Sequence, residues 1–116
     1  MNESGRKGEA AAEAYLILKG YEIIEKNFSC RFGEIDLIAA KGRYLVFCEV
    51  KTRSDRAIVG AVESVGPQKI ARIIRAASYY LSSGKHSQLQ PRFDVIAVRK
   101  RGPFYFVSEH IEDAFS

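Results

Sequence analysis

The sequence predicts an α/β fold in which a mixed β-sheet is flanked by helices, with the elements in the order α-β-β-β-α-β-β. Two amphipathic stretches have helical periodicity, and each ends at a glycine. Five short stretches have the apolar runs or alternation of strands. The second helical stretch separates three strands from the last two. We therefore expect it to cross over and return the chain parallel to an earlier strand.

The first predicted helix spans residues 6–19, where alanine and leucine favour helix, and Gly20 ends it. Glu9 and Glu13 are four residues apart, so both lie on one face beside the apolar stripe. That stripe is predicted to consist of Ala10, Ala11, Ala14, Ile17 and Leu18.

The other elements follow from apolar patterns and turn residues. The second helix is expected to begin at Pro67 and to end at Gly84, after a polar connection over 52–66. The pair of strands on either side of the "KG" turn at 41–42 is predicted to form an antiparallel hairpin. The predicted strands are 21–28, 32–40, 43–51, 92–100 and 104–110, and a short helix is expected over 111–115.

Size and composition fit one domain over residues 1–116. Hydrophobic residues make up 47% of the chain, which is enough for a core and argues against disorder. Lys and Arg number 18 against 14 Asp and Glu, and this mild excess favours a polyanionic partner.

We expect no membrane association and a cytoplasmic protein, because no apolar stretch is long enough to span a bilayer and the N-terminus lacks a signal-peptide core. Cys30 and Cys48 are expected to be reduced thiols.

Charged residues interrupt two neighbouring predicted strands. Glu49 and Lys51 share one face of the third strand, and Glu34 and Asp36 share a face of the second. Pairing across the hairpin is expected to bring Asp36 near Phe47 and to set Glu34 opposite Glu49. Clustered carboxylates repel one another unless a cation lies among them, and oxygen ligands suit Mg²⁺ or Mn²⁺. The sequence therefore favours a metal site here, with Lys51 at its rim. The alternative is a solvated sheet face with cross-strand ion pairs.

The stretches "GEIDLIA" (33–39) and "VFCEVKTR" (46–53) resemble the D-(about a dozen residues)-E-x-K signature of the PD-(D/E)XK nuclease superfamily. The similarity is closest to the small bacterial UPF0102 proteins, which are similar in fold to archaeal Holliday-junction resolvases. It covers most of the chain, including the leading helix with a glutamate, "PQKIARI" and "RFDVIAV". The resemblance implies a restriction-endonuclease-like fold.

By this resemblance, Asp36 and Glu49 are metal ligands and catalytic residues, and Lys51 is the catalytic lysine. The backbone carbonyl of Val50 and the carboxylate of Glu13 are implied as further metal ligands. The implied cofactor is Mg²⁺ or Mn²⁺.

Three further positions bear on the resemblance to this nuclease superfamily. Ile35 stands where the motif often has proline. Glu34 is expected to support the site or cap the hairpin rather than to bind metal. Glu13 has an alternative, which is to pair with Arg6 or Lys19 or to remain solvated.

Basic residues dominate from Pro67 to Arg101, where Asp94 is the only acid. Asp94 interrupts an apolar strand and is expected to pair with Arg92 or a helix N-terminus, and the alternative is a supporting role behind the metal ligands. A phosphate backbone could follow such a surface without sequence preference, although the alternative is the ordinary wet face of an amphipathic helix. The residues predicted to bind nucleic acid are Arg53, Lys69, Arg72 and Arg75.

The leading hypothesis is a Mg²⁺-dependent endonuclease that cuts DNA by metal-activated attack of water on a phosphodiester. Branched or junction DNA is the candidate substrate, and a homodimer is expected by analogy with the resolvases. One alternative is a non-catalytic module with a nuclease-like fold that binds nucleic acid or a protein partner. Another is a metal-dependent hydrolase of a small phosphate ester.

Overall fold

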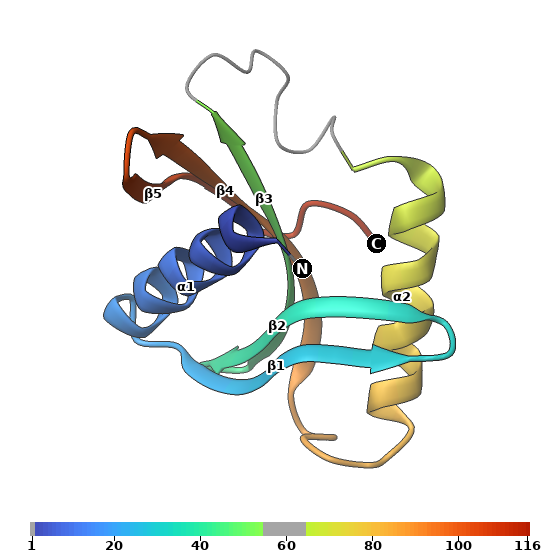
Figure 1. Ribbon diagram of the computed structural model, residues 1–116. Helices are drawn as coiled ribbons and strands as arrows, with labels where there is room; N and C mark the ends of the chain where they lie inside the picture. Colours follow the sequence, from blue (N-terminus) through green and yellow to red (C-terminus); the bar gives the residue numbers. More distant parts are fainter. Residues whose placement is uncertain (1, 55–64) are drawn as a thin grey trace.

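The computed structural model describes residues 2–54 and 65–116, and the greater part of the 52–66 connection lies outside them. Within the described residues, the elements follow the predicted α-β-β-β-α-β-β order (Figure 1). They are α1 (Glu3–Leu18), β1 (Glu22–Cys30), β2 (Gly33–Lys41), β3 (Tyr44–Ser54), α2 (Pro67–Leu81), β4 (Gln90–Arg101) and β5 (Phe104–Ile111). The mixed α/β fold is confirmed and is consistent with the restriction-endonuclease-like architecture.

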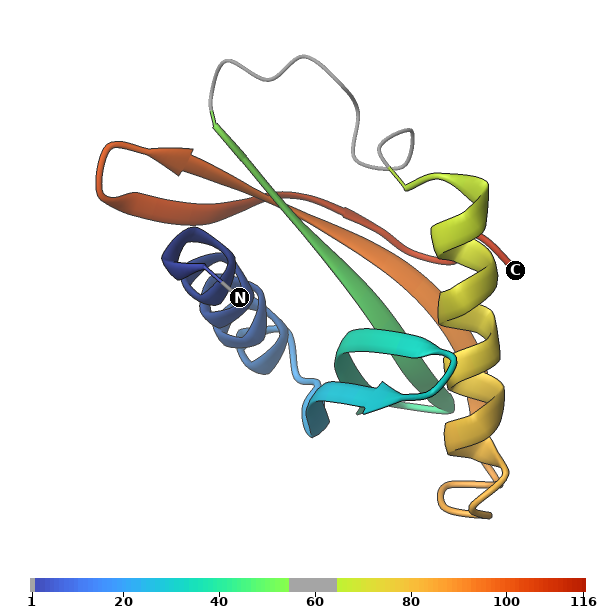
Figure 2. The same ribbon diagram turned by 45° about the vertical axis from the view of Figure 1, so that its right-hand side comes forward.

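The five strands form one sheet in the order β1-β2-β3-β4-β5. β3 and β4 are parallel, and the other neighbouring strands are antiparallel. The chain passes from β3 through α2 to β4, which confirms the predicted crossover. The two helices lie on opposite faces of the sheet (Figures 1 and 2).

The register of the β2–β3 hairpin differs from the predicted one by two residues. Leu37 pairs with Cys48 and Ile38 with Phe47, so the prediction of Asp36 near Phe47 is wrong. The reason is the turn: Lys41 pairs with Tyr44, and Gly42 adopts a φ of 59° in a two-residue turn. In this register Leu37, which follows Asp36, lies opposite Cys48, which precedes Glu49.

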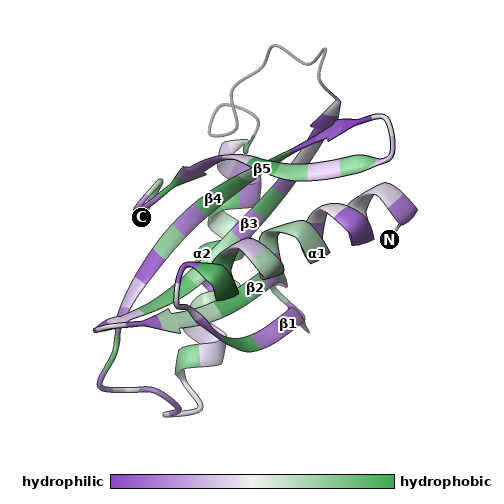
Figure 3. Cartoon of the chain, turned by 90° about the vertical axis from the view of Figure 1, so that its left-hand side faces the viewer, coloured by the Kyte–Doolittle hydropathy of each residue, from purple (hydrophilic) through white to green (hydrophobic). Residues whose placement is uncertain are grey.

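Each face of the sheet packs its own hydrophobic cluster. Phe47 and Val95 pack with the buried face of α2, whereas Val46 and Ile96 pack with α1. Figure 3 shows hydrophobic colour along the middle of the sheet and hydrophilic colour toward the strand ends. The functional groups of β3 lie toward such an end, where the strand leaves the core.

The alternation predicted for β2 fails at Asp36. Leu37 and Ala39 pack in the α1 cluster, as strand alternation requires, but Ile35 packs in the α2 cluster. The ladder with β3 ends at Leu37, one residue after Asp36 in the sequence. Residues on either side of the predicted metal ligand thus pack on different helices, although the pairing of β2 with β1 keeps one register there.

The predicted apolar stripe of α1 is also wrong. Gly8, Ala12 and Leu16 are the buried residues, while Ile17 and Leu18 are 54% and 87% exposed. The small residues Gly8 and Ala12 on this face let the helix approach the sheet closely. A Cβ atom on Gly8 would overlap Oγ1 of Thr52.

The last residues do not form the predicted helix. β5 continues to Ile111, and the chain then turns at Asp113, which has a φ of 52°. The backbone N–H of Asp113 donates to Asp94 Oδ1 (3.1 Å), and Phe115 stacks on Phe93. Through these contacts the residues after β5 pack against the sheet.

Cys30 and Cys48 are both free thiols, as predicted. Neither α1 nor α2, the helices of the described residues, is long and apolar enough to cross a bilayer.

Candidate active site

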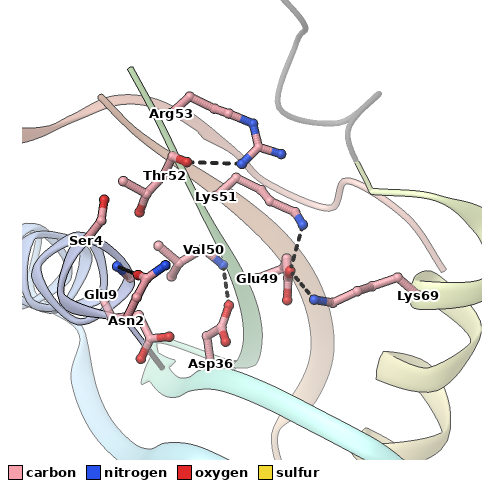
Figure 4. Close-up of a pocket in the computed structure, with 11 residues that line it drawn as sticks. Asn2, Ser4, Glu9, Asp36, Glu49, Val50, Lys51, Thr52, Arg53 and Lys69 are labelled. Atoms are coloured by element: carbon pink, nitrogen blue, oxygen red, sulfur yellow. Dashed lines mark hydrogen bonds and ion pairs between the residues drawn. The ribbon is translucent and has the colours of Figure 1, made fainter. Parts of the chain in front are cut away.

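A polar pocket opens where α1 begins, between β2, β3 and α2 (Figure 4). It gathers carboxyl groups from three different elements: Glu9 from α1, Asp36 from β2 and Glu49 from β3. Lys51, Arg53 and Lys69 complete the charged lining. The pocket therefore brings together residues that are far apart in the sequence.

Asp36 is fixed by the backbone of β3. The N–H of Val50 donates to Asp36 Oδ2 at 2.7 Å, in place of a bond to the backbone of β2. The N–H and C=O of a strand residue point toward the same neighbouring strand. The carbonyl of Val50 therefore faces the side of β3 on which Asp36 lies, where the resemblance requires it.

Glu49 is nearly fully buried, with 3% of its side chain exposed, and is held by two ammonium groups. Its Oε2 lies 3.3 Å from Nζ of Lys51 and 3.0 Å from Nζ of Lys69. Lys51 is mostly buried, whereas Lys69 reaches in from α2 and stays half exposed. The predicted core of the site, Asp36, Glu49 and Lys51, is thus assembled in one place.

The crowding of carboxyl groups changes their acidity. Burial and the charge of Glu49 raise the pKa of Asp36 to about 8, against the opposing hydrogen bond from Val50. Burial also raises the pKa of Glu9, although hydrogen bonds with Asn27 and Asp36 oppose it. Such shifts indicate a pocket with too little positive charge beside Asp36.

The negative charge of the pocket also shifts the pKa of Lys69. Burial alone would lower the pKa of this lysine, but its hydrogen bond and charge pairing with Glu49 raise it above the ordinary value. Lys69 therefore remains charged at neutral pH.

The carboxylate that α1 brings to the pocket is Glu9 and not Glu13. Figure 4 shows the carboxyl group of Glu9 beside Asp36. Glu13 lies outside this pocket, with its Oε1 3.7 Å from Nζ of Lys26. The four-residue spacing places both glutamates on one face of α1, but it does not predict which of the two helical turns lies at the pocket.

The other predicted residues lie around the pocket at different distances. Arg53 lines it and donates to the carbonyl of Thr52. Glu34 and Arg72 line an adjoining hollow that also contains Asp36 and Glu49. Arg75 is exposed on α2 and lines neither space.

Comparison with known proteins gives the family. The sequence model of the uncharacterised protein family UPF0102 matches residues 8–98. A UPF0102 protein from Syntrophotalea carbinolica is 45% identical, over 96% of this chain and 89% of its own length. One from Prosthecochloris aestuarii is 43% identical, over 98% and 94%. The chain belongs to the UPF0102 family.

A third relative matches a shorter stretch. The UPF0102 protein from Moorella thermoacetica is 48% identical, over 81% of this chain and 78% of its own length. The names of these three relatives give the family and state no activity.

The pocket of this UPF0102 protein suits a hard cation by its donor chemistry. Among the described residues, no group of three or more His, Cys, Asp or Glu side chains is already arranged around a common metal position. The oxygen donors nevertheless meet the preference of Mg²⁺ and Mn²⁺ for carboxylate, carbonyl and water ligands. The raised pKa of Asp36 marks where a cation would relieve repulsion. The residues that could hold it are Asp36, Glu49, Glu9 and, through its carbonyl, Val50.

Proposed function

We propose that this UPF0102 protein is a Mg²⁺- or Mn²⁺-dependent endonuclease that hydrolyses phosphodiester bonds in DNA, with branched or junction DNA as its candidate substrate. The observation that carries the proposal is the meeting of Asp36, Glu49 and Lys51 in one pocket with a basic rim. A solvated sheet face would not bury Glu49 against two lysines. A buried carboxylate cluster with perturbed acidity is typical of functional sites.

The carboxylates of Asp36 and Glu49 would hold the metal, helped by Glu9 and the Val50 carbonyl. When bound, such a metal lowers the pKa of a coordinated water and stabilises charge on a phosphate oxygen. The bond from the Val50 N–H fixes the carboxyl of Asp36, so it needs no rearrangement when substrate arrives.

The two lysines have different roles because they differ in exposure. Lys51 is mostly buried beside Glu49, where its ammonium group can orient the attacking water or offset charge on the phosphate. Lys69 is half exposed, so it can leave Glu49 and contact a substrate phosphate. Arg53 and Arg72 extend the basic rim along the two hollows.

The test is cleavage of branched, flapped and linear DNA in Mg²⁺ or Mn²⁺ by the wild type, Asp36→Ala and Lys51→Ala. We expect each substitution to lower the rate about a hundredfold or more, because Asp36→Ala removes a proposed metal ligand and Lys51→Ala removes the ammonium group beside the attacking water. Lys19→Ala, an exposed change outside the pocket, is the control and should cleave like the wild type. Equal residual activity in all the proteins would mean that this pocket does not cut DNA.

A non-catalytic module that binds nucleic acid or a protein partner is the second candidate. The observation in its favour is that Lys51 and Lys69 already neutralise Glu49 without a metal. Calorimetric titration with Mg²⁺ and Mn²⁺ separates the candidates. DNA binding without metal uptake supports the module, whereas metal uptake that Asp36→Ala abolishes supports the nuclease.

A further inference from the structure

Two aromatic rings meet on the surface beside the pocket. Phe32, in the turn between β1 and β2, and Tyr79, on α2, have ring centroids 6.0 Å apart and planes inclined by 60°. Tyr79 is 50% exposed, and the guanidinium carbon of Arg31 lies 4.8 Å from the ring centroid of Phe32. The side chains of Arg31, Phe32, Arg72 and Tyr79 are called here the stacking surface.

The core does not require Tyr79. Its neighbour Tyr80 is buried and packs edge-on against Phe28 and Phe47, which fills the space between α2 and the sheet. Tyr79 points away from that packing and leaves an aromatic ring open to solvent. An exposed ring beside cationic groups is a suitable surface for a nucleobase.

The stacking surface is held in a fixed shape. A Cβ atom on Gly33 would lie 3.2 Å from Cβ of Arg72, so the hairpin turn lies directly against α2. Figures 1 and 2 show the β1–β2 turn beside this helix. A base that stacked here would not have to order a loose loop, which lowers the entropic cost of binding.

The stacking surface and the candidate active site share a hollow. Arg72, a member of the stacking surface, lines it together with Asp36 and Glu49. Gly33, which follows Phe32, also lines it. α2 carries three basic residues and no acid, so the same flank attracts phosphates. Lys69 and Arg72 are three residues apart on the helix, and Tyr79 is two turns beyond Arg72.

These observations point to DNA with unpaired bases. Paired bases in a duplex present only their edges, whereas stacking on an aromatic ring requires a base that has left the helix. We infer that the stacking surface binds unpaired bases of single-stranded DNA, such as a flap or an overhang, beside the phosphate to be cut. The inference rests on the proposed function and names the substrate class of the same site.

The test measures binding without divalent metal, so that it does not depend on cleavage. Fluorescence anisotropy compares a single-stranded oligodeoxynucleotide with a blunt duplex of the same length, for the wild type, Tyr79→Ala and Tyr79→Phe. We expect Tyr79→Ala to weaken single-strand binding about five- to a hundredfold and to leave duplex binding nearly unchanged. Tyr79→Phe keeps the ring and should bind like the wild type.

Two further measurements separate stacking from a structural effect. A 2-aminopurine in the bound oligonucleotide should be quenched by the wild type and by Tyr79→Phe, but not by Tyr79→Ala. Phe104→Ala, which removes an aromatic ring that is 70% exposed on β5, should leave both affinity and quenching unchanged.

The outcomes distinguish the two proposals. Single-strand binding that depends on Tyr79, without cleavage in Mg²⁺, supports the stacking surface and refutes the nuclease. Asp36-dependent cleavage with unchanged binding and quenching in Tyr79→Ala refutes the stacking surface alone. Equal wild-type affinity for single strand and duplex also overturns it. So does loss of self-association in Tyr79→Ala with unchanged DNA affinity, which would assign the surface to a second copy of the chain.

Discussion

Glu9 and Glu13 lie one helical turn apart on α1 and have different neighbours. Glu9 lines the pocket with Asp36, and burial raises its pKa. Glu13 is paired with Lys26 on the neighbouring strand β1. The same side chain can thus be part of the candidate metal site or a surface ion pair, depending on one turn of helix.

The pair permits a matched test of the site. We expect Glu9→Gln to lower metal affinity or cleavage rate at least about tenfold, because it removes a charged oxygen donor beside Asp36. Glu13→Gln removes a half-buried surface ion pair and should change neither quantity measurably. Calorimetric titration with Mn²⁺ and the cleavage assay measure the two effects. A larger loss from Glu13→Gln would contradict the position assigned to Glu9.

At the scale of elements, the position of α1 depends on how closely it approaches β3. Gly8 faces Thr52, and a Cβ atom at residue 8 would overlap Oγ1 of that threonine. The contact lies one residue from Glu9 on the helix and one residue from Lys51 on the strand. Close packing here therefore sets the distance between the carboxylate of α1 and the groups of β3.

Gly8→Ala tests this contact. Alanine favours helix by about 1 kcal/mol over glycine, so an open site would be stabilised. At residue 8 we expect instead a loss of about 1–3 kcal/mol in the free energy of unfolding, because overpacking forces α1 away from β3. Urea denaturation measures the change.

Two variants control the experiment. Gly66→Ala adds the same methyl group where no atom lies within 4 Å, and should alter stability by less than about 1 kcal/mol. Adding Thr52→Ala to Gly8→Ala removes the overlapping oxygen and should restore part of the loss. A Gly8→Ala protein as stable as the wild type would show that α1 does not need this approach.

At the scale of the whole molecule, Asp94 ties distant segments together. Its carboxylate is fully buried, receives two hydrogen bonds from Arg92 and lies 2.7 Å from Nε2 of His110. His110 in turn contacts Tyr15 of α1, and Arg92 donates to the hydroxyl of Tyr21. The expectation that Asp94 pairs with Arg92 is confirmed. Its network also reaches α1 through Tyr15 and the C-terminal residues through the N–H of Asp113.

This network predicts a dependence of stability on pH. Burial alone would raise the pKa of Asp94, but the hydrogen bonds from His110, Arg92 and the Asp113 backbone lower it overall. A lowered folded pKa stabilises the protein above the unfolded pKa of about 3.9, and this contribution is lost as pH falls through the folded value.

Asp94→Asn should therefore lower the free energy of unfolding by about 3–5 kcal/mol at pH 7, since it leaves the mostly buried Arg92 with only the exposed Glu112, 3.8 Å away, as a charge partner. The difference from the wild type should be smaller at pH 3, which lies below the unfolded pKa of about 3.9, and should shrink further as the pH falls toward the lowered folded pKa of Asp94. Urea denaturation at both pH values measures it. Asp113→Asn keeps the backbone N–H that bonds Asp94 and should match the wild type. A constant difference across this pH range would rule out the charge as the cause.

The sequence by itself determined the element order, the parallel return after α2 and the two charged strands. These features follow from local signals. Pro67 starts a helix, Gly42 permits a tight hairpin turn, and alternation puts Glu49 and Lys51 on one face of β3. The resemblance to nucleases rested on the same local residues, and the family was then confirmed over residues 8–98.

Only the tertiary structure decided which distant groups meet. The choice of Glu9 over Glu13 depends on how α1 packs through Gly8, and the pairing of Lys69 with Glu49 depends on where α2 crosses the sheet. The shifted hairpin register depends on which residues form the turn, and local alternation is equally satisfied by a two-residue slip. Periodicity fixes the face on which a side chain lies, but the packing of elements fixes the partner it finds there.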